Sequence, residues 1–211
     1  MTILLTGFES NDGGWNASER LVHSLCTEPP REIPWFAESV RCEIMPGDTH
    51  ALEAALREAL VRHRPRCCLF LGQAPGRNRV ALERIATNWR EFRTPDRAGN
   101  KPGGEPIVAD GPAARTSTLP DLPGLISALQ GEGIPAAISH HAGTHLCNQL
   151  LYLGLHVAAS CEPVPVVGFV HIPILPEQVI HGHPDSPCFS MDMLRRAIRT
   201  VLTSYFDMLA R

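Results

Sequence analysis

The fold is decided by one stretch of the chain, residues 134–153, which reads IPAAISHHAGTHLCNQLLYL. Its first five residues are almost all apolar, which is typical of a strand buried within a sheet, and a glycine-containing turn follows. Residues 144–158 then have the apolar spacing of a helix. A strand that leads through a tight turn into a helix is the building unit of α/β proteins.

The same alternation of strand and helix continues along the rest of the chain. The predicted strands cover residues 3–6, 39–45, 67–71, 79–86, 134–138 and 164–171. The predicted helices cover residues 17–22, 48–62 with Asp48 as N-cap, 122–130, 144–158, and 191–209 with Ser190 as N-cap. Residues 88–112 are rich in Pro, Gly and charge, and we expect an extended loop there. This order predicts an α/β fold, a three-layer α/β/α sandwich with a mixed, largely parallel sheet.

Composition bounds the class of protein. A length of 211 residues favours a single domain over residues 1–211, and 44% hydrophobic with 19% charged residues excludes a disordered chain. A formal net charge of -3 argues against a nucleic-acid partner. The first residues lack the basic start and apolar length of a signal peptide, and we expect no membrane partner and a cytoplasmic location. The seven scattered cysteines contain no CxxC pair, which favours reduced thiols.

Cys147 lies where the helix of the opening stretch is predicted to begin. Backbone N–H groups at a helix start are unpaired, and together with a nearby imidazole they can lower the pKa of a thiol. A thiol activated in this way is a nucleophile for carbonyl groups. A buried structural cysteine agrees equally well with the local pattern.

Two further polar residues occupy strands that are otherwise apolar. Glu83 lies within residues 80–86, where burial requires a cationic or histidine partner. His171 ends another apolar run, a position that often carries functional side chains, although a hydrogen-bonded core histidine is the alternative. If one nitrogen of His171 donates to Glu83, the other can accept the proton of Cys147, which gives a catalytic triad.

Other polar groups give weaker indications. Residues 72–77 form a Gly-rich loop without the Lys-Ser/Thr of a P-loop or the glycine spacing of a dinucleotide turn. Two groups of histidines, in residues 140–145 and 181–183, raise the possibility of a metal site, but no acidic partner accompanies either, and we expect no metal or cofactor. Arg93 falls in the long loop, where an arginine is by default a solvated charge.

Six motifs occur in order along the chain: LLTGFE at residues 4–9, GQAPGR at 72–77, ERIATN at 83–88, GPAA at 111–114, AGTHLCN at 142–148 and GFVHIP at 168–173. With them the chain resembles the pyroglutamyl peptidase I (pyrrolidone-carboxylate peptidase) family of cysteine peptidases over residues 3–179. The resemblance agrees with the predicted fold, of the phosphorylase/hydrolase-like kind.

The resemblance implies roles for particular residues. The catalytic residues of the family fall on Glu83, Cys147 and His171, which local chemistry also selects. It further implies that Arg93 helps to hold the oxyanion. The residues implied to bind the substrate are Phe8, Gln73, His145 and Leu146.

The implied reaction is removal of an N-terminal pyroglutamyl residue from a peptide through a thioester on Cys147. The implied partners are therefore peptides with a blocked, pyroglutamyl N-terminus, and the resemblance implies a homo-oligomer, a dimer or tetramer. No cofactor is implied.

Two departures from the family concern the ring pocket. Ser10-Asn11-Asp12 replaces a segment that contains a second phenylalanine, and His145 stands where the family has Phe or Tyr. Trp15 is a candidate to fill one side of the pocket. Altered acyl-group specificity, peptide binding without turnover, a nucleoside phosphorylase of the same architecture and a metal-binding module are the alternatives.

Overall fold

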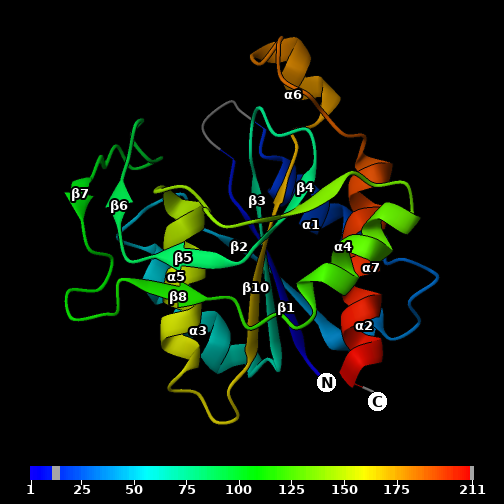
Figure 1. Cartoon of the computed structure of the whole chain (residues 1–211), viewed down its shortest axis with the longest axis horizontal. Coiled ribbons are helices and arrows are strands. Elements are labelled where there is room, and N and C mark those ends of the chain that lie inside the picture. The colour runs from blue at the N-terminus through cyan, green and yellow to red at the C-terminus, as the bar shows by residue number, and fades with distance from the viewer. Residues whose placement is uncertain (11–14, 210–211) are drawn as a thin grey trace.

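The computed structural model describes residues 1–10 and 15–209, and its centre is a six-stranded sheet (Figure 1). The strand order is β2-β1-β3-β10-β4-β9. The strands are β1 (Ile3–Phe8), β2 (Val40–Met45), β3 (Cys67–Gln73), β4 (Val80–Glu83), β9 (Ala136–Ser139) and β10 (Val166–Ile172). Only the β4–β10 pair is antiparallel in this sheet, which confirms the prediction of a mixed, largely parallel sheet.

Helices cover both faces of the sheet (Figure 1). One face is covered by α3 (Leu52–His63) and α5 (Leu146–Ala158). The other face is covered by α1 (Ala17–Thr27), α4 (Leu122–Gly131) and α7 (Met191–Leu209), and the short helices are α2 (Phe36–Ser39) and α6 (Pro176–His181). Successive strand residues point to opposite faces, so each central strand contributes to both apolar cores. The predicted three-layer sandwich is confirmed.

The polypeptide between β4 and α4 differs from the prediction. The strand expected over residues 79–86 is interrupted at Arg84, whose N–H donates to the carbonyl of Ser139 and whose carbonyl accepts from Ser117. Beyond it, β5 (Ile85–Thr87) pairs with β8 (Ala114–Thr116) in a separate sheet. The predicted loop over residues 88–112 contains a second small sheet, formed by β6 (Arg90–Glu91) and β7 (Gly103–Glu105). Because the first strand ends early, Glu83 becomes the last residue of β4.

Helix caps agree with the sequence at one of the two predicted positions. The Oγ of Ser190 accepts from the N–H of Met193 at 3.2 Å, as expected of an N-cap. The expected cap at Asp48 was wrong, because its carboxylate bonds the N–H of His50 in the preceding turn and α3 has Ala51 as its N-cap. None of the helices among the described residues combines the length and apolar character that crossing a membrane requires.

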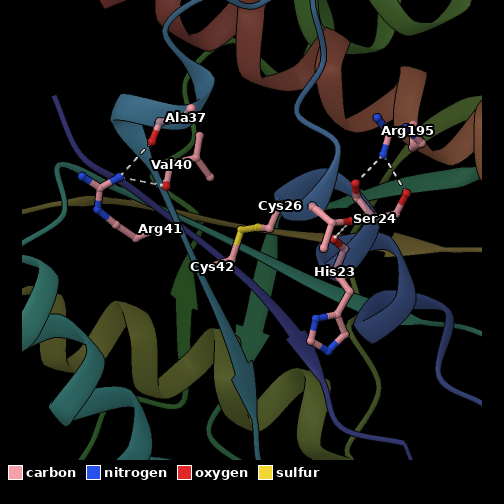
Figure 2. The surroundings of a disulfide bond; sticks show 9 residues. His23, Ser24, Cys26, Ala37, Val40, Arg41, Cys42 and Arg195 are labelled. Carbon is pink, nitrogen blue, oxygen red and sulfur yellow. Dashed lines mark hydrogen bonds between the residues drawn. A yellow bond between two sulfur atoms is a disulfide. The ribbon is translucent and has the colours of Figure 1, made fainter.

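Two of the seven cysteines are joined. Cys26, near the end of α1, forms a disulfide with Cys42 in the edge strand β2, and their Cα atoms are 6.7 Å apart (Figure 2). The expectation of reduced thiols was therefore wrong for this pair, because α1 packs against β2 and brings two residues distant in sequence together. The free cysteines are Cys67, Cys68, Cys147, Cys161 and Cys188.

Helix α5 approaches the sheet closely at Gly154. A Cβ atom at this position would lie 2.4 Å from Cε2 of Phe70 and 3.2 Å from Cγ1 of Val167, and the Phe70 ring is fully buried. The missing side chain thus sets the distance between the helix and strands β3 and β10. The first turn of the same helix carries Cys147.

We predict that Gly154→Ala destabilises the protein. Alanine would gain up to about 1 kcal/mol of helix propensity, but overpacking of a buried site costs about 1–3 kcal/mol, so we expect a net loss on the order of 1 kcal/mol. Urea unfolding measures this free energy. Gly131→Ala, in α4 with no atom near its Cβ position, is the matched control and should cost nothing. A Gly154→Ala protein as stable as the wild type would contradict the packing argument.

Candidate functional site

Strand alternation brings three residues to the sheet face that α5 covers. Phe70 in β3 and Phe169 in β10 belong to the core beneath α5, and Gly72 and His171 are two residues further along the same strands. The parallel register pairs Gly72 directly with His171. Glu83, opposite Phe169 in the antiparallel strand β4, points to the same face.

Cys147 joins this group from α5, the helix that covers this face of the sheet. It is the second residue of α5, and a Cβ atom at Gly72 would lie 2.8 Å from its Sγ. The sulfur therefore stands over Gly72, beside the paired His171. Among the described residues, no direct hydrogen bond joins the sulfur to the imidazole, and a looser contact of this kind is common before substrate binds. The structure thus gathers Glu83, His171 and Cys147 at one place.

The turn before α5 is fixed by its own hydrogen bonds. Gly143 has a φ of +85°, a left-handed conformation that glycine adopts without strain. Thr144 exchanges two hydrogen bonds with Glu91, through its Oγ1 at 2.7 Å and its carbonyl at 3.1 Å. His145 is the N-cap residue in extended conformation. These contacts hold the start of the helix against the segment around β6.

Glu83 and His171 form a buried hydrogen-bonded pair. Their exposed fractions are 1% and 4%, and Nδ1 of His171 lies 2.7 Å from Oε1 of Glu83. The guanidinium of Arg77 donates to the same oxygen at 2.8 Å. Burial acts to raise the pKa of Glu83, but the hydrogen bond and charge of His171, a hydrogen bond from Ser139 and the charge of Arg77 together outweigh it and hold that pKa below its ordinary value. Since Glu83 is ionised, Nδ1 carries the imidazole proton and Nε2 is left as an acceptor.

The thiol and the imidazole are both neutral at rest. Burial raises the pKa of Cys147 to about 12, the negative charge of Glu83 adds to the rise, and Arg77 opposes it. Burial also lowers the pKa of His171, against the opposing effect of Glu83. The backbone at the helix start acts to lower the thiol pKa, as expected, but desolvation outweighs it and the net pKa is raised.

Arg93 lies on the loop that follows β6. The residue is exposed, follows the buried Phe92, and lines a cavity of about 560 Å³ together with Lys101, His141 and His145. Among the described residues, none of the hydrogen bonds or ion pairs involves Arg93. The structure places this arginine beside the turn that leads to α5, and its predicted contact with an oxyanion stays a prediction.

The loop carrying Arg93 is anchored by a buried carboxylate. Asp96 accepts hydrogen bonds from the N–H groups of Thr49 and Asn100, both at 2.8 Å. Burial acts to raise the pKa of Asp96, but these bonds outweigh it and lower that pKa. Thr49 in turn bonds the side chain of Gln149 in α5 at 2.6 Å. The loop and the helix of Cys147 are thus held together.

Two of the residues implied to bind substrate, His145 and Leu146, begin α5, and a third, Phe8, shares the buried cluster of Leu146. Phe8, at the end of β1, and Leu146, at the first position of α5, belong to the same buried cluster as Phe92. The ring of His145 stacks on Phe92 with centroids 3.9 Å apart, and its Nε2 lies 3.2 Å from the carbonyl of Thr94. Burial lowers the pKa of His145, so the ring is neutral and acts as a flat surface. The histidine thus keeps part of an aromatic side chain's packing role.

Gln73 points away from this cluster, to the side of α1. Its Oε1 accepts from the N–H of Ala17 and from Nε2 of Gln178, each at 2.8 Å. The same Nε2 donates to the carbonyl of Trp15, a residue that is 40% exposed and whose ring lies under the guanidinium of Arg20. Gln73 therefore joins α1 to α6, and its contact with a substrate stays a prediction. Of the altered opening loop, residues 11 and 12 lie outside the described residues.

The histidine groups do not converge into a cluster of ligands. His141 Nδ1 accepts from the N–H of Gly143 at 2.8 Å, and His145 stacks as described above. Within residues 1–10 and 15–209, no three His, Cys, Asp or Glu side chains form a group that could hold a metal ion.

Two residues that reasoning from sequence left without a role support the site. Asn148 is buried, and its amide bonds the backbone of Thr87 and Trp89, which joins the start of α5 to the segment leading to Arg93. Arg77 is the last residue of the motif GQAPGR, and its sequence context alone indicates no function. The sequence held a signal for each. Asn148 is a polar residue directly after the candidate nucleophile, and Arg77 is a cation close in sequence to the acid Glu83.

Known proteins resemble this chain over nearly its full length. The family model described as Pyroglutamyl peptidase matches residues 1–206. A pyrrolidone-carboxylate peptidase of Escherichia fergusonii is 37% identical over 95% of this chain and 91% of its own. The structure of pyroglutamyl peptidase I from Bacillus amyloliquefaciens has a TM-score of 0.84 and 36% identity, covering 95% of this chain and 94% of that one.

A second similar structure is a mutant pyrrolidone carboxyl peptidase from the hyperthermophile Pyrococcus furiosus. It has a TM-score of 0.88 and 32% identity, and the match covers 99% of this chain and 100% of that one. Sequence and fold agree over nearly the full length of each chain. This chain therefore belongs to the pyroglutamyl peptidase family.

Proposed function

We propose that this chain is a cysteine exopeptidase that removes an N-terminal pyroglutamyl residue from peptides. The observation that carries the proposal is the buried Glu83–His171 hydrogen bond on the sheet face where Cys147 Sγ stands over Gly72. Family membership supplies the substrate class, since the similar proteins are named for the pyroglutamyl, or pyrrolidone-carboxylate, group.

Acylation follows from the protonation states at rest. Because the Cys147 thiol is neutral, its proton has to leave as the sulfur attacks the carbonyl that joins the lactam ring to the next residue. His171 Nε2 accepts that proton, and Glu83 stabilises the imidazolium through Nδ1. The imidazolium then protonates the leaving amine, and a thioester remains on Cys147.

Deacylation uses the same groups with water as nucleophile. His171 takes a proton from water, water attacks the thioester carbonyl, and the thiol is released together with free pyroglutamate. Each attack creates an oxyanion, and the unpaired N–H groups at the start of α5, with Arg93, are the donors proposed to stabilise it.

Selectivity is proposed to come from an apolar pocket for the lactam. Phe8, Leu146 and the stacked ring of His145 supply its surfaces. A pyroglutamyl residue carries no N-terminal ammonium, so it enters such a pocket without the cost of burying a charge. A peptide with a free N-terminus would bear that cost.

Replacement of the nucleophile tests the mechanism. We expect Cys147→Ala to lower kcat/KM for a pyroglutamyl fluorogenic amide by at least about 1,000-fold, because the sulfur that forms the proposed thioester is removed. Cys188→Ser, which changes an exposed free thiol, is the matched control and should keep wild-type activity. Unchanged turnover after complete alkylation at Cys147 would refute the mechanism. A wild type that cleaves only other acyl amides would point to altered specificity.

The pH dependence tests the role of His171. Burial lowers the pKa of its imidazole below the ordinary 6.5, so the neutral, base-competent form persists to more acidic pH than in a free histidine. We therefore expect the acid limb of kcat/KM to have its midpoint below pH 6.5. Steady-state rates across the acid range measure it. A midpoint above that value would speak against this assignment.

Gly72→Ala tests the position of the Cys147 sulfur. The added Cβ would lie 2.8 Å from Cys147 Sγ and 2.7 Å from Cζ of Phe169, so the sulfur has to move. Displacement of a reacting atom by about 1 Å can cost on the order of 100-fold, and we expect a loss of that size in kcat/KM. Gly103→Ala, with open space around its Cβ position, is the control. Circular dichroism verifies folding, and a folded, fully active Gly72→Ala protein would show that the sulfur sits elsewhere.

A further inference from the structure

We propose that Arg77 is a positioning residue of this site. It orients Glu83 toward His171 and connects this pair to the turn before Cys147. It also places a positive charge next to the buried carboxylate of Glu83. The proposal rests on the function proposed above. Among the described residues, the side chain of Arg77 makes no hydrogen bond to Cys147 or His171, so it acts on them through Glu83 and through its charge.

The guanidinium of Arg77 bridges two elements of the site. Arg77 lies in the turn between β3 and β4, where Gly76 has a φ of +86°. Its Nη1 donates to Oε1 of Glu83 at 2.8 Å, and its Nη2 donates to the carbonyl of His141 at 3.2 Å. One planar group thus spans from the end of β4 to the turn that starts the helix of Cys147. A lysine has a single charged nitrogen and no such fork.

Both partners of Glu83 converge on one oxygen. Oε1 accepts from Arg77 and from Nδ1 of His171, while Ser139, at the end of β9, also favours the ionised form. The imidazole is neutral at rest, so Arg77 is the group that brings positive charge to a carboxylate with no exposed side-chain surface. An ionised carboxyl buried without such a charge would be strongly destabilised.

The same charge acts on the other two members of the triad. The groups that face the Cys147–His171 pair are Glu83 and Arg77, and they act in opposite directions. Arg77 favours the thiolate of Cys147 and disfavours the imidazolium of His171. Removing the cation should therefore protonate His171 at higher pH and make the thiol harder to ionise.

The same turn offers a matched control for a mere surface charge. Arg79 lies two residues on, is exposed, and bonds only its neighbour Asn78 through Nε among the described residues. By contrast, the side chain of Arg77 is 29% exposed and its partner Glu83 is fully buried. A pair of this kind is not equivalent to an exposed ion pair.

Kinetics of Arg77→Met, Arg77→Lys and Arg79→Met test the proposal. We expect Arg77→Met to lower kcat roughly 10- to 100-fold, as for residues that orient a functional partner, and to move the acid limb of kcat/KM to higher pH. Arg77→Lys keeps the charge but loses the fork, so it should lose part of kcat and keep the acid limb in place. Arg79→Met should match the wild type. Wild-type kcat and acid limb in Arg77→Met would overturn the proposal.

A second measurement needs no substrate. Site-resolved mass spectrometry follows iodoacetamide labelling of Cys147 against pH, with the exposed Cys188 as internal reference. In Arg77→Met we expect slower labelling of Cys147 at neutral pH and a pH dependence displaced upward, with Cys188 unchanged. If the wild type cleaves no pyroglutamyl amide but Arg77→Met still shows this shift in Cys147 labelling, the role of Arg77 is supported and the proposed function fails.

Folding is monitored by circular dichroism. If Arg77→Met does not fold, Arg77→Lys decides: reduced kcat with an unmoved acid limb supports the proposal, and wild-type kcat overturns it. A folded Arg77→Met whose Cys147 labelling profile matches the wild type would reduce Arg77 to a structural tie and overturn the proposal.

Discussion

The hydrogen bond between Glu83 and His171 is the constraint on which the proposed site depends. Moving a carboxylate out of water costs several kcal/mol, and the cost is offset only when the group is hydrogen-bonded and paired with a charge. His171 and Arg77 meet both needs at one oxygen. The same bond fixes the tautomer of the imidazole and leaves its second nitrogen free to serve Cys147.

The fold builds this arrangement from backbone geometry. Strand alternation directs Glu83 and His171 to one face, and the antiparallel pairing of β4 with β10 sets them near each other across the ladder. Two glycines then admit the helix: Gly154 lets α5 approach the sheet, and Gly72 leaves room for the sulfur of Cys147. Positions without a side chain are thus as important here as the polar residues.

Much of the architecture could be predicted from sequence because buried strands and amphipathic helices leave strong apolar patterns. Glu83, Cys147 and His171 stood out because a polar residue in an apolar strand, or a thiol at a helix start, departs from its surroundings. The resemblance to a known family reinforced the same three. The break at Arg84 left no such pattern, because it depends on hydrogen bonds to strands far along the chain.

The remaining differences have the same physical origin. The Cys26–Cys42 disulfide requires that α1 and β2 pack together, which spacing in sequence cannot show. The raised pKa of the Cys147 thiol reflects desolvation of the sulfur in the folded chain and the negative charge of Glu83, and a helix start alone does not reveal either. The role proposed for Arg77 depends on its hydrogen bonds to Glu83 and to the carbonyl of His141, which only the folded chain brings together.

The proposed triad implies a covalent intermediate, and trapping it is the most direct test. An activated pyroglutamyl ester is mixed with the wild-type protein, quenched in acid during turnover, and examined by intact-mass and peptide mapping. The account predicts one pyroglutamyl group, held as a thioester on Cys147. Turnover with no adduct on the protein, or with the acyl group on another residue, would contradict it.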